Sequence, residues 1–374
     1  MKRLVVCADG TWNSKDHAKD DGAGLTNVAK LARAVAERDA AGVEQRTYYH
    51  EGVGVGPWHE KVLGGAFGVG LSRNVQACYG WLVDQYEPGD QLFLFGFSRG
   101  AYTARSIAGL VRNSGLLKRE HRARVEEAYA LYRDRAPDAH PRAAKSVAFR
   151  QAYAHEPRIH CLGVWDSVGA LGVPTSGPVG WWTRRKYGFH DVGLSARVDH
   201  AFHALAIDER RKPFAPSLWE IPDADLTPGR TQVVEQVWFA GVHANVGGGY
   251  ADCGLSDAAL AWMIDRAAGA GLAFRPGAAD ALRARCDGTL HDSMSTFYKV
   301  MGEHRRPIRA ERRGGDGRPA HTFEAVHPSV FERRRSASPA YDPENLRDYV
   351  ARHGEPAPPP ALPPAQRTDA GVRA

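Results

Sequence analysis

The sequence predicts an α/β fold with a mostly parallel central sheet and helices on both of its faces. Short apolar runs alternate along the chain with segments of helical periodicity, and this alternation is typical of parallel sheets. We expect strands at 3–9, 45–53, 91–97, 158–166 and 233–243, of which 45–53 is the weakest. We expect helices at 24–38, 71–86, 100–115 and 256–271.

The strand predictions rest mainly on apolar composition. The runs RLVVCAD (3–9), QLFLFGF (91–97) and RIHCLGVWD (158–166) are almost continuously apolar, as strands covered on both faces tend to be. The run VVEQVWFAGVH (233–243) alternates between polar and apolar residues before it turns apolar. These strands therefore belong in the interior of a layered domain.

The chain of 374 residues allows one large domain, which we expect over residues 1–353. Lid-like insertions are predicted at about 52–70, which is glycine-rich, and at about 173–230. The tail 354–374 is rich in proline and is predicted to be disordered, because it cannot build a core.

The second insertion carries aromatic residues beside cationic ones. The residues concerned are Trp181, Trp182, Arg184, Arg185 and Lys186. Such a cluster suits a lipid–water interface, where aromatic rings and long cationic side chains bridge the two phases. Ordinary packing of a surface loop explains the cluster equally well, so both interpretations stay open.

The overall composition argues against several classes of protein. The net charge of +6 permits peripheral contact with an anionic membrane surface, but the arginines are scattered and no nucleic-acid-binding motif accompanies them. Denser basic runs lie at 304–313 and 332–338, and we expect them to form a solvated face. We therefore expect no nucleic-acid partner.

The five cysteines form no C-x-x-C pair, and their odd number argues against a disulfide framework. Cys7 and Cys161 fall inside predicted strands, where buried reduced thiols are common. The apolar run near the N-terminus has only five residues, too few for a secretory signal, and no window is long enough to span a membrane. We expect synthesis in the cytosol, with any export through a signal-independent route. We expect neither a metal site nor a cofactor.

Polar residues with chemical potential follow the predicted strands. Ser98, Asp166 and His243 end successive strands in that chain order, and ligands of open α/β sheets bind at the carboxyl ends of strands. Ser, Asp and His in this order match the catalytic residues of α/β-hydrolases. The predicted fold is therefore α/β-hydrolase-like.

Ser98 lies in the pentapeptide Gly96-Phe97-Ser98-Arg99-Gly100, between a predicted strand and a predicted helix. A nucleophile in such a sharp turn needs small neighbours two residues away on either side, since larger side chains would collide with the strand and the helix. The N-terminus of the helix also favours a developing negative charge. The alternative is a serine that only caps the helix.

Asp166 and His243 each have an alternative interpretation. Asp166 could orient an imidazole, or it could be an aspartate that caps a turn. His243, followed by the glycine-rich run 246–250, could be the general base, or it could be a hydrogen-bonded core histidine. His327 also follows a short β-like run and is the rival base, whereas His203 is expected to pack on a helix or loop.

The first strand ends in Asp9-Gly10-Thr11, which is similar to the nucleophile motif of haloacid-dehalogenase-type phosphatases. The nucleophilic aspartate of that motif would fall at position 7, which is Cys7, so this chemistry is set aside. The backbone of Gly10 and Thr11 could instead form an oxyanion hole with the N–H of Arg99. An ordinary turn capped by Asp9 is an equal alternative.

Five motifs together resemble a known family. They are CADGTWN (7–13), GFSRGAYTAR (96–105), GVWDSVGALG (163–172), HALAIDERR (203–211) and WFAGVHANVGGGY (238–250). The set resembles an uncharacterised α/β-hydrolase family that includes the catalytic domains of type VI secretion phospholipase effectors of the first lipase-effector class. The resemblance covers roughly residues 1–335.

The resemblance implies a serine hydrolase that cleaves ester bonds of lipids with Ser98, Asp166 and His243 as its triad. It also implies a secretion-system or immunity protein as partner. Asn245 departs from the family pattern, which usually has Asp at that position. The chain also lacks the long membrane-associating region that such effectors often carry. A thioesterase or acyltransferase with the same triad, and a non-catalytic interaction module, are the alternatives.

Overall fold

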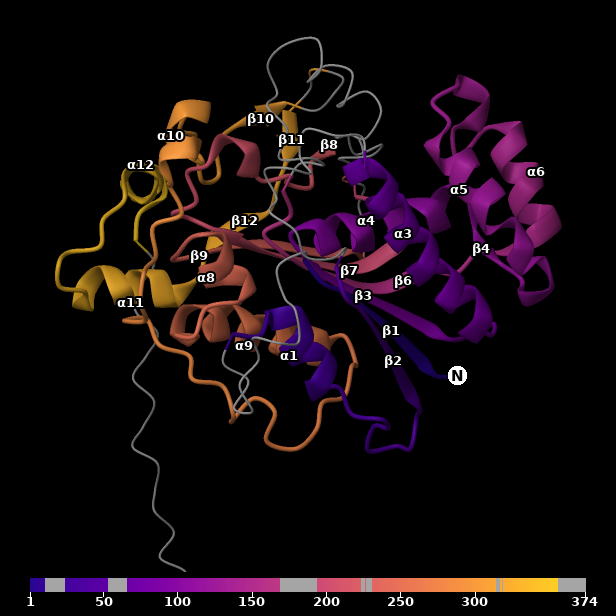
Figure 1. The fold of residues 1–374 in the computed structure, drawn as a ribbon, viewed down its shortest axis with the longest axis horizontal. Coiled ribbons are helices and arrows are strands. Elements are labelled where there is room, and N and C mark those ends of the chain that lie inside the picture. The colour runs from indigo at the N-terminus through magenta and orange to yellow at the C-terminus, as the bar shows by residue number, and fades with distance from the viewer. Residues whose placement is uncertain are drawn as a thin grey trace, which may run out of the picture.

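The computed structural model describes residues 1–10, 24–52, 66–168, 194–222, 231–313 and 319–355, with the single residues 226 and 317. Its centre is a seven-stranded sheet in the order β12-β9-β7-β6-β3-β1-β2 (Figure 1). Every neighbouring pair in this sheet is parallel, which confirms the predicted fold class. The strands are β1 (Arg3–Ala8), β2 (Gln45–His50), β3 (Gln91–Phe97), β6 (Ile159–Trp165), β7 (Val198–Ala206), β9 (Val233–Phe239) and β12 (Glu324–Val326).

Helices cover both faces of the sheet (Figure 1). Leu4 and Val6 of β1 belong to one buried cluster, which also contains residues of α3 (Ala66–Gln85), α4 (Arg99–Ser114) and α5 (Val125–Arg133). Their neighbours Val5 and Cys7 belong to a second cluster with residues of α1 (Asn27–Ala34) and α9 (Gly254–Gly269). Alternate side chains of a strand point to opposite faces, so an apolar strand serves two layers at once.

A third buried cluster lies beside β9 and β12. It joins Trp238 of β9 to Phe331 of α11 (Pro328–Ser336) and Leu346 of α12 (Glu344–His353). The remaining helices are α6 (Ala144–Tyr153), α8 (His243–Gly247), α10 (Thr296–Met301), η2 (Arg119–Arg124), η3 (Pro137–Ala139) and η4 (Lys212–Phe214). The short strands β4 (Leu116–Leu117) and β5 (Ala154–His155) pair with each other, while β10 (Arg312–Arg313), β11 (Pro319–His321) and β8 (Ile221–Pro222) form a small sheet.

The structure corrects three sequence predictions. The segment 173–230, expected as an insertion, contains β7, which lies between β6 and β9 in the main sheet. His203, expected on a helix or loop, lies on this strand. Helix α3 begins at Ala66, inside the segment 52–70 that was expected to be a loop or lid. The segments 53–65 and 169–193 lie outside the described residues.

The order of the strands positions the site. From β1 the chain passes to β2 on one side, and then returns to β3 on the other side of β1. The connections therefore reverse direction between β1 and β3, and the crevice at such a point is where open α/β sheets bind ligands. The residues that follow β1 and β3 are those of the Asp9 and Ser98 segments. No helix of the described part of the chain is long and apolar enough to cross a membrane.

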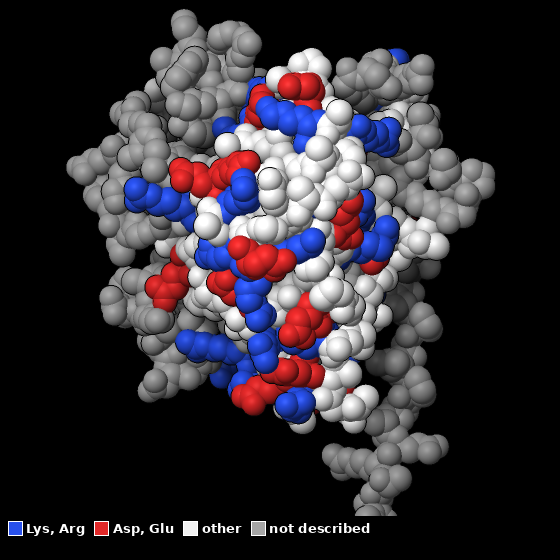
Figure 2. All heavy atoms as spheres, turned by 90° about the vertical axis from the view of Figure 1, so that its right-hand side faces the viewer, with Lys and Arg blue, Asp and Glu red and all other residues white. Residues whose placement is uncertain are grey.

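The net positive charge is not gathered on the face formed on the α5 and α6 side. Figure 2 shows Lys and Arg interspersed there with Asp and Glu. Helices α5 and α6 themselves form ion pairs with nearby residues, among them Glu127 with Arg124 and Lys145 with Asp134. On its described residues this face is a mixed, solvated one.

Candidate active site

Ser98 lies in the turn between β3 and α4. Its backbone has φ 55° and ψ −117°, and a positive φ is uncommon for a residue with a side chain. The Ser98 N–H donates to the Trp165 carbonyl oxygen at 3.1 Å, which holds the turn against β6. The Ser98 side chain makes no capping hydrogen bond to α4, so the geometry does not match the helix-capping alternative.

Close packing explains why glycines flank Ser98. A Cβ atom at Gly96 would overlap the carbonyl oxygen of Gly100, and one at Gly100 would overlap the carbonyl oxygen of Ala8. The start of α4 thus lies directly against the ends of β1 and β3. The sequence predicted this steric requirement, and the structure confirms it.

Asp166 follows β6 directly and is completely buried. It too has a positive φ, 39°. Its Oδ2 lies 2.6 Å from His243 Nδ1, and its Oδ1 accepts the Ala206 N–H at 3.0 Å. Burial alone would raise the pKa of Asp166, but the charge of Arg306 and the hydrogen bonds from His243 and Arg306 hold it well below its usual range. The side chain is thus an ionised carboxylate aimed at an imidazole, unlike an aspartate that caps a turn.

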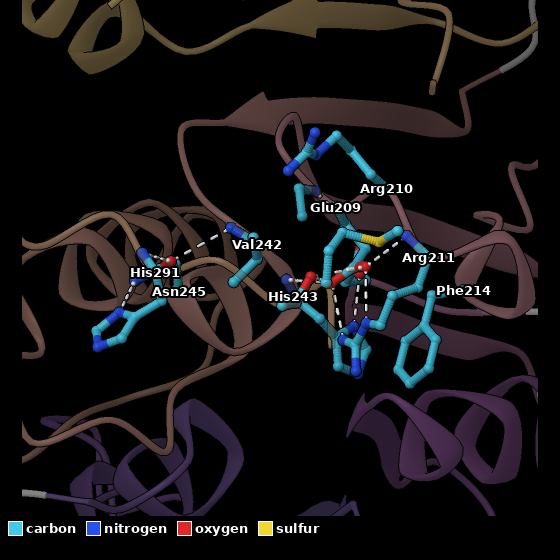
Figure 3. Close-up of polar contacts among 12 residues, drawn as sticks. Glu209, Arg210, Arg211, Phe214, Val242, His243, Asn245 and His291 are labelled. Carbon is cyan, nitrogen blue, oxygen red and sulfur yellow. Dashed lines mark hydrogen bonds and ion pairs between the residues drawn. The ribbon is translucent and has the colours of Figure 1, made fainter. Parts of the chain in front are cut away.

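His243 is the first residue of the short helix α8, four residues after the end of β9. Its ring centroid lies 4.6 Å from that of Phe97, the residue before Ser98, and 5.1 Å from that of Phe214. Figure 3 shows His243 with Phe214 and Arg211 on one side and Asn245 with His291 on the other. Ser98, Asp166 and His243 therefore come from the carboxyl ends of β3, β6 and β9, at one edge of the sheet.

The two other histidines considered in the sequence analysis, His327 and His203, have different environments. His327 caps α11 and its Nδ1 lies 2.8 Å from Ser329 Oγ, while its ring stacks on Phe239. Burial lowers the pKa of His327 to about 4. His203 is fully buried, and its Nε2 accepts the Ser167 N–H. Burial lowers the pKa of His203 to about 3. The described contacts therefore bring His243 to Asp166, and neither His327 nor His203.

The first strand end lies beside Ser98, as the sheet order requires. A Cβ atom on Gly10 would be 3.5 Å from Ser98 Cβ. Asp9 is a buried hydrogen-bond acceptor: it receives the Gly10 N–H at 2.6 Å, and the hydroxyls of Thr26 at 2.5 Å and Tyr49 at 2.6 Å. Burial raises the pKa of Asp9 above its usual value. Thr11 lies outside the described residues.

An ion pair that was not predicted from the sequence, Glu209 with Arg211, holds the backbone of His243. Glu209 is buried after β7 and accepts the His243 N–H at 3.2 Å. Arg211 donates to both oxygens of Glu209, each at 2.8 Å. Burial would raise the pKa of Glu209, but hydrogen bonds and the charge of Arg211 lower it. The sequence signals were a run of charged residues, 208–211, directly after an apolar segment, and its place in the motif HALAIDERR (203–211).

The role of Arg306 was not predicted either, and its position shows that the expectation of a solvated basic face was wrong for this residue. It lies in the basic run 304–313, yet its side chain is 1% exposed and its Nη1 lies 2.6 Å from Asp166 Oδ1. In the second basic run, Arg333 is also buried and donates to the carbonyl oxygens of Cys286 and Gly288. Nothing in the sequence distinguishes these two arginines from their exposed neighbours.

Comparison with known proteins decides the family. The model of the family described as "T6SS, Phospholipase effector Tle1-like, catalytic domain" matches residues 2–266. The chain belongs to this family. The match contains Ser98, Asp166 and His243, whereas Arg306 lies beyond its end.

Relatives of this effector-type domain are longer than the chain. Over 234 residues the chain is 27% identical to the uncharacterized protein YEL023C of Saccharomyces cerevisiae, an alignment that covers 57% of this chain and 32% of the yeast protein. An uncharacterized protein from Pseudomonas aeruginosa has a solved structure with a TM-score of 0.43 and 18% identity, covering 80% of this chain and 48% of that one. The structure of the Tle1 effector bound to the VgrG spike of the type VI secretion system gives a TM-score of 0.36 and 17% identity, covering 66% of this chain and 51% of that one. The chain thus spans about a third of the yeast protein and about half of each solved chain.

Two further predictions for this domain concern a lid and metal binding. The candidate lid residues Trp181, Trp182 and Arg184 lie outside the described residues. Among the residues that the structure does describe, no group of three or more His, Cys, Asp or Glu side chains could hold a metal ion.

Proposed function

We propose that this protein is a serine hydrolase that cleaves carboxylic ester bonds of lipids, with phospholipids as the substrate class. The observation that carries the proposal is the 2.6 Å contact between His243 Nδ1 and the buried Asp166 carboxylate. It occurs at the same edge of the sheet as the strained strand-to-helix turn of Ser98. A carboxylate that orients an imidazole near such a serine is the arrangement that acyl transfer needs.

In the proposed acylation step, His243 takes the proton of the Ser98 hydroxyl while the Ser98 oxygen attacks the ester carbonyl carbon. The carbonyl π electrons move to the carbonyl oxygen and form a tetrahedral oxyanion. When the oxyanion collapses, the bond to the leaving alkoxide breaks and His243 returns the proton to it. The products are an alcohol and an acyl group on Ser98.

In the proposed deacylation step, water repeats this sequence. His243 takes a proton from the water as its oxygen attacks the acyl carbon, and the bond to Ser98 then breaks with the proton returned to the Ser98 oxygen. Asp166 holds the imidazole in place and stabilises its charged form in both steps. The reaction needs no cofactor.

The oxyanion is proposed to bind backbone N–H groups. Arg99 opens α4, and the positive end of a helix dipole favours an anion at that point. The second donor would come from Gly10, which lies beside Ser98, or from Thr11. Because the Gly10 N–H already donates to Asp9, we assign this role first to Thr11.

The lipid part of the proposal rests on membership of the phospholipase-effector family. Trp181, Trp182 and Arg184 are proposed to form part of a lid at the lipid surface, within a single domain over residues 1–353. Since one Tle1 structure contains a VgrG spike, a type VI secretion component is the proposed partner, with export by a signal-independent route. Co-purification with a VgrG-type spike protein would test that partnership.

The function is tested with the purified full chain, its Ser98→Ala variant and a Ser295→Ala control. Ser295 is a matched control because it also precedes a helix, makes no side-chain capping bond and is exposed. Hydrolysis is measured on p-nitrophenyl esters of several chain lengths, on thioesters and on phospholipid vesicles. We expect Ser98→Ala to lose activity by on the order of 10⁴-fold or more, with Ser295→Ala unchanged.

Each alternative predicts another result. Equal rates for the wild type and Ser98→Ala would overturn the serine-hydrolase proposal and favour a non-catalytic interaction module. Cleavage of soluble esters but not of vesicles would remove the phospholipid substrate. Preference for thioesters, or acyl transfer to an added alcohol, would favour the thioesterase or acyltransferase alternative.

A further inference from the structure

The Asp166 carboxylate has a second charged partner besides His243. Arg306 Nη1 lies 2.6 Å from Asp166 Oδ1, and Arg306 Nη2 lies 3.1 Å from Asp166 Oδ2. Both side chains are buried, with Arg306 1% and Asp166 0% exposed. Two parallel N–H bonds from a planar guanidinium fix a carboxylate in orientation as well as in position.

The backbone anchors this ion pair from both sides. Arg306 Nη1 also donates to the Ala206 carbonyl oxygen at 2.8 Å, and Nη2 donates to the Phe214 carbonyl oxygen at 2.6 Å. Asp166 Oδ1 accepts the Ala206 N–H at 3.0 Å. With His243 included, each carboxylate oxygen receives two hydrogen bonds. The orientation of Asp166 toward His243 therefore depends on Arg306 as well as on β7.

We propose that Arg306 is a positioning residue of this active site, which aligns Asp166 with His243 and offsets the negative charge that His243 faces. The inference rests on the proposed function, in which His243 acts as the base for Ser98. Arg306 itself is not proposed to touch the substrate. It would set the pH range over which the base works.

The charge argument follows from the surroundings of His243. A buried, uncompensated carboxylate strongly favours the protonated imidazole beside it, and a protonated imidazole cannot act as a base. Arg306 cancels much of this effect, because it brings a positive charge to the same carboxylate. Glu209 is another charged group that contacts His243, through the His243 backbone N–H, and it is itself paired with Arg211. The buried His203 contacts the backbone N–H of Ser167, the residue after Asp166. Because the charge of Glu209 is offset by Arg211, the net charge close to His243 depends mainly on whether Arg306 offsets Asp166.

The test compares Arg306→Met, Arg306→Lys and the control Arg305→Met in the full chain. Arg305 is the adjacent arginine, 56% exposed and paired with Glu344, so its removal controls for loss of one positive charge nearby. Two quantities are followed from pH 5 to pH 9: kcat and KM on p-nitrophenyl butyrate, and the rate at which a fluorophosphonate probe labels Ser98. Circular dichroism checks that each variant is folded.

For Arg306→Met we expect the acid limb of both pH profiles to move to higher pH by about one unit or more. The variant loses the positive charge that contacts Asp166, so the Asp166 carboxylate favours the protonated form of His243 more strongly. For Arg306→Lys we expect the limb to stay within a few tenths of a unit and kcat to fall about tenfold with KM unchanged, because the charge remains while the bidentate geometry is lost. Arg305→Met should match the wild type in every respect.

A uniform loss of rate in Arg306→Met with an unmoved acid limb would overturn the charge role and leave a merely structural one. If that variant does not fold, Arg306→Lys still decides the positioning role, and a kcat equal to wild type would overturn it. Failure of the proposed function gives a different pattern, because wild-type and Ser98→Ala proteins would then hydrolyse the ester equally. Labelling of Ser98 without ester hydrolysis would reject the ester substrate yet still report on Arg306.

Discussion

Asn245 and His291 are joined by two hydrogen bonds that run in opposite directions. Asn245 Oδ1 accepts the His291 backbone N–H at 3.2 Å, and Asn245 Nδ2 lies 3.2 Å from His291 Nδ1. The same amide accepts the Val242 N–H at 3.3 Å and donates to the Thr289 carbonyl oxygen at 3.0 Å. All four bonding positions of the amide are thus used, and they tie the start of α8, which carries His243, to residues 289–291 (Figure 3).

This arrangement gives Asn245 a structural role that the Asp implied by the family resemblance could not fill, since a carboxylate cannot donate to Thr289. We predict that Asn245→Asp lowers the free energy of unfolding by about 1–3 kcal/mol, because a buried acceptor would face a carbonyl oxygen. Urea unfolding at pH 7 measures this, with Gln151→Glu on the exposed surface of α6 as the amide-to-carboxylate control. Equal stability of Asn245→Asp and wild type would contradict the role assigned to the amide.

The identity of the base gives a second prediction. His243→Ala should reduce kcat by on the order of 10⁴-fold or more, since His243 is the histidine that contacts Asp166. His327→Ala should keep most of its activity and lose stability instead, because that ring stacks on Phe239. Full activity in His243→Ala together with inactive His327→Ala would reverse the assignment.

The turn at Ser98 gives a third prediction. Gly100→Ala should destabilise the protein by roughly 2–3 kcal/mol and impair hydrolysis, because its Cβ would overlap the carbonyl oxygen of Ala8 at the end of β1. Gly269→Ala, at the end of α9, is the matched control, since nothing lies within 4 Å of the added Cβ. Thermal unfolding of both variants measures the difference. A Gly100→Ala protein as stable as the control would disprove the packing argument.

Buried neutral histidines give a fourth prediction, for stability against pH. Burial lowers the pKa of His203 to about 3 and that of His327 to about 4, whereas both titrate near 6.5 when unfolded. Below about pH 6.5 the unfolded chain binds these protons and the folded chain does not, so the free energy of unfolding should fall as pH falls. Each histidine contributes a slope of roughly 1 kcal/mol per pH unit between about pH 6 and its folded pKa.

Urea unfolding at pH 7, 6 and 5 tests this sign. His203→Gln should show a shallower loss of stability over that range than the wild type, while His353→Gln, which changes an exposed histidine, should follow the wild type. A steeper slope in His203→Gln would show that the sign is wrong.

Composition and short-range pattern were enough to predict most of the sheet. The apolar runs at β1, β3 and β6 and the glycines around Ser98 reflect local requirements, namely burial on both faces and close packing in a turn. β7 was missed because 200-HAFHALA-206 is rich in alanine and histidine, which show no β preference. That segment is a strand because of its neighbours β6 and β9.

Site residues that directly follow a strand could be predicted from the sequence, whereas site residues elsewhere in the chain could not. Ser98 and Asp166 follow apolar runs directly, so their positions could be predicted from sequence. Glu209 and Arg306 matter through contacts with residues far away in the chain, and a charged run looks the same in sequence whether it is solvated or buried. Only the three-dimensional arrangement separates Arg306 from Arg305.

Asp166 and Arg306 are 140 residues apart in the chain, and this separation limits how the domain can be divided. A fragment that stopped at residue 266, where the family match ends, would keep Ser98, Asp166 and His243. It would lose Arg306, and with β12 it would lose the strand that covers the free edge of β9. Cleavage between α9 and α10 followed by separation of the two pieces should therefore inactivate the protein without removing any member of the proposed triad. We therefore expect that the protein cannot be cut at the end of the family match without losing activity.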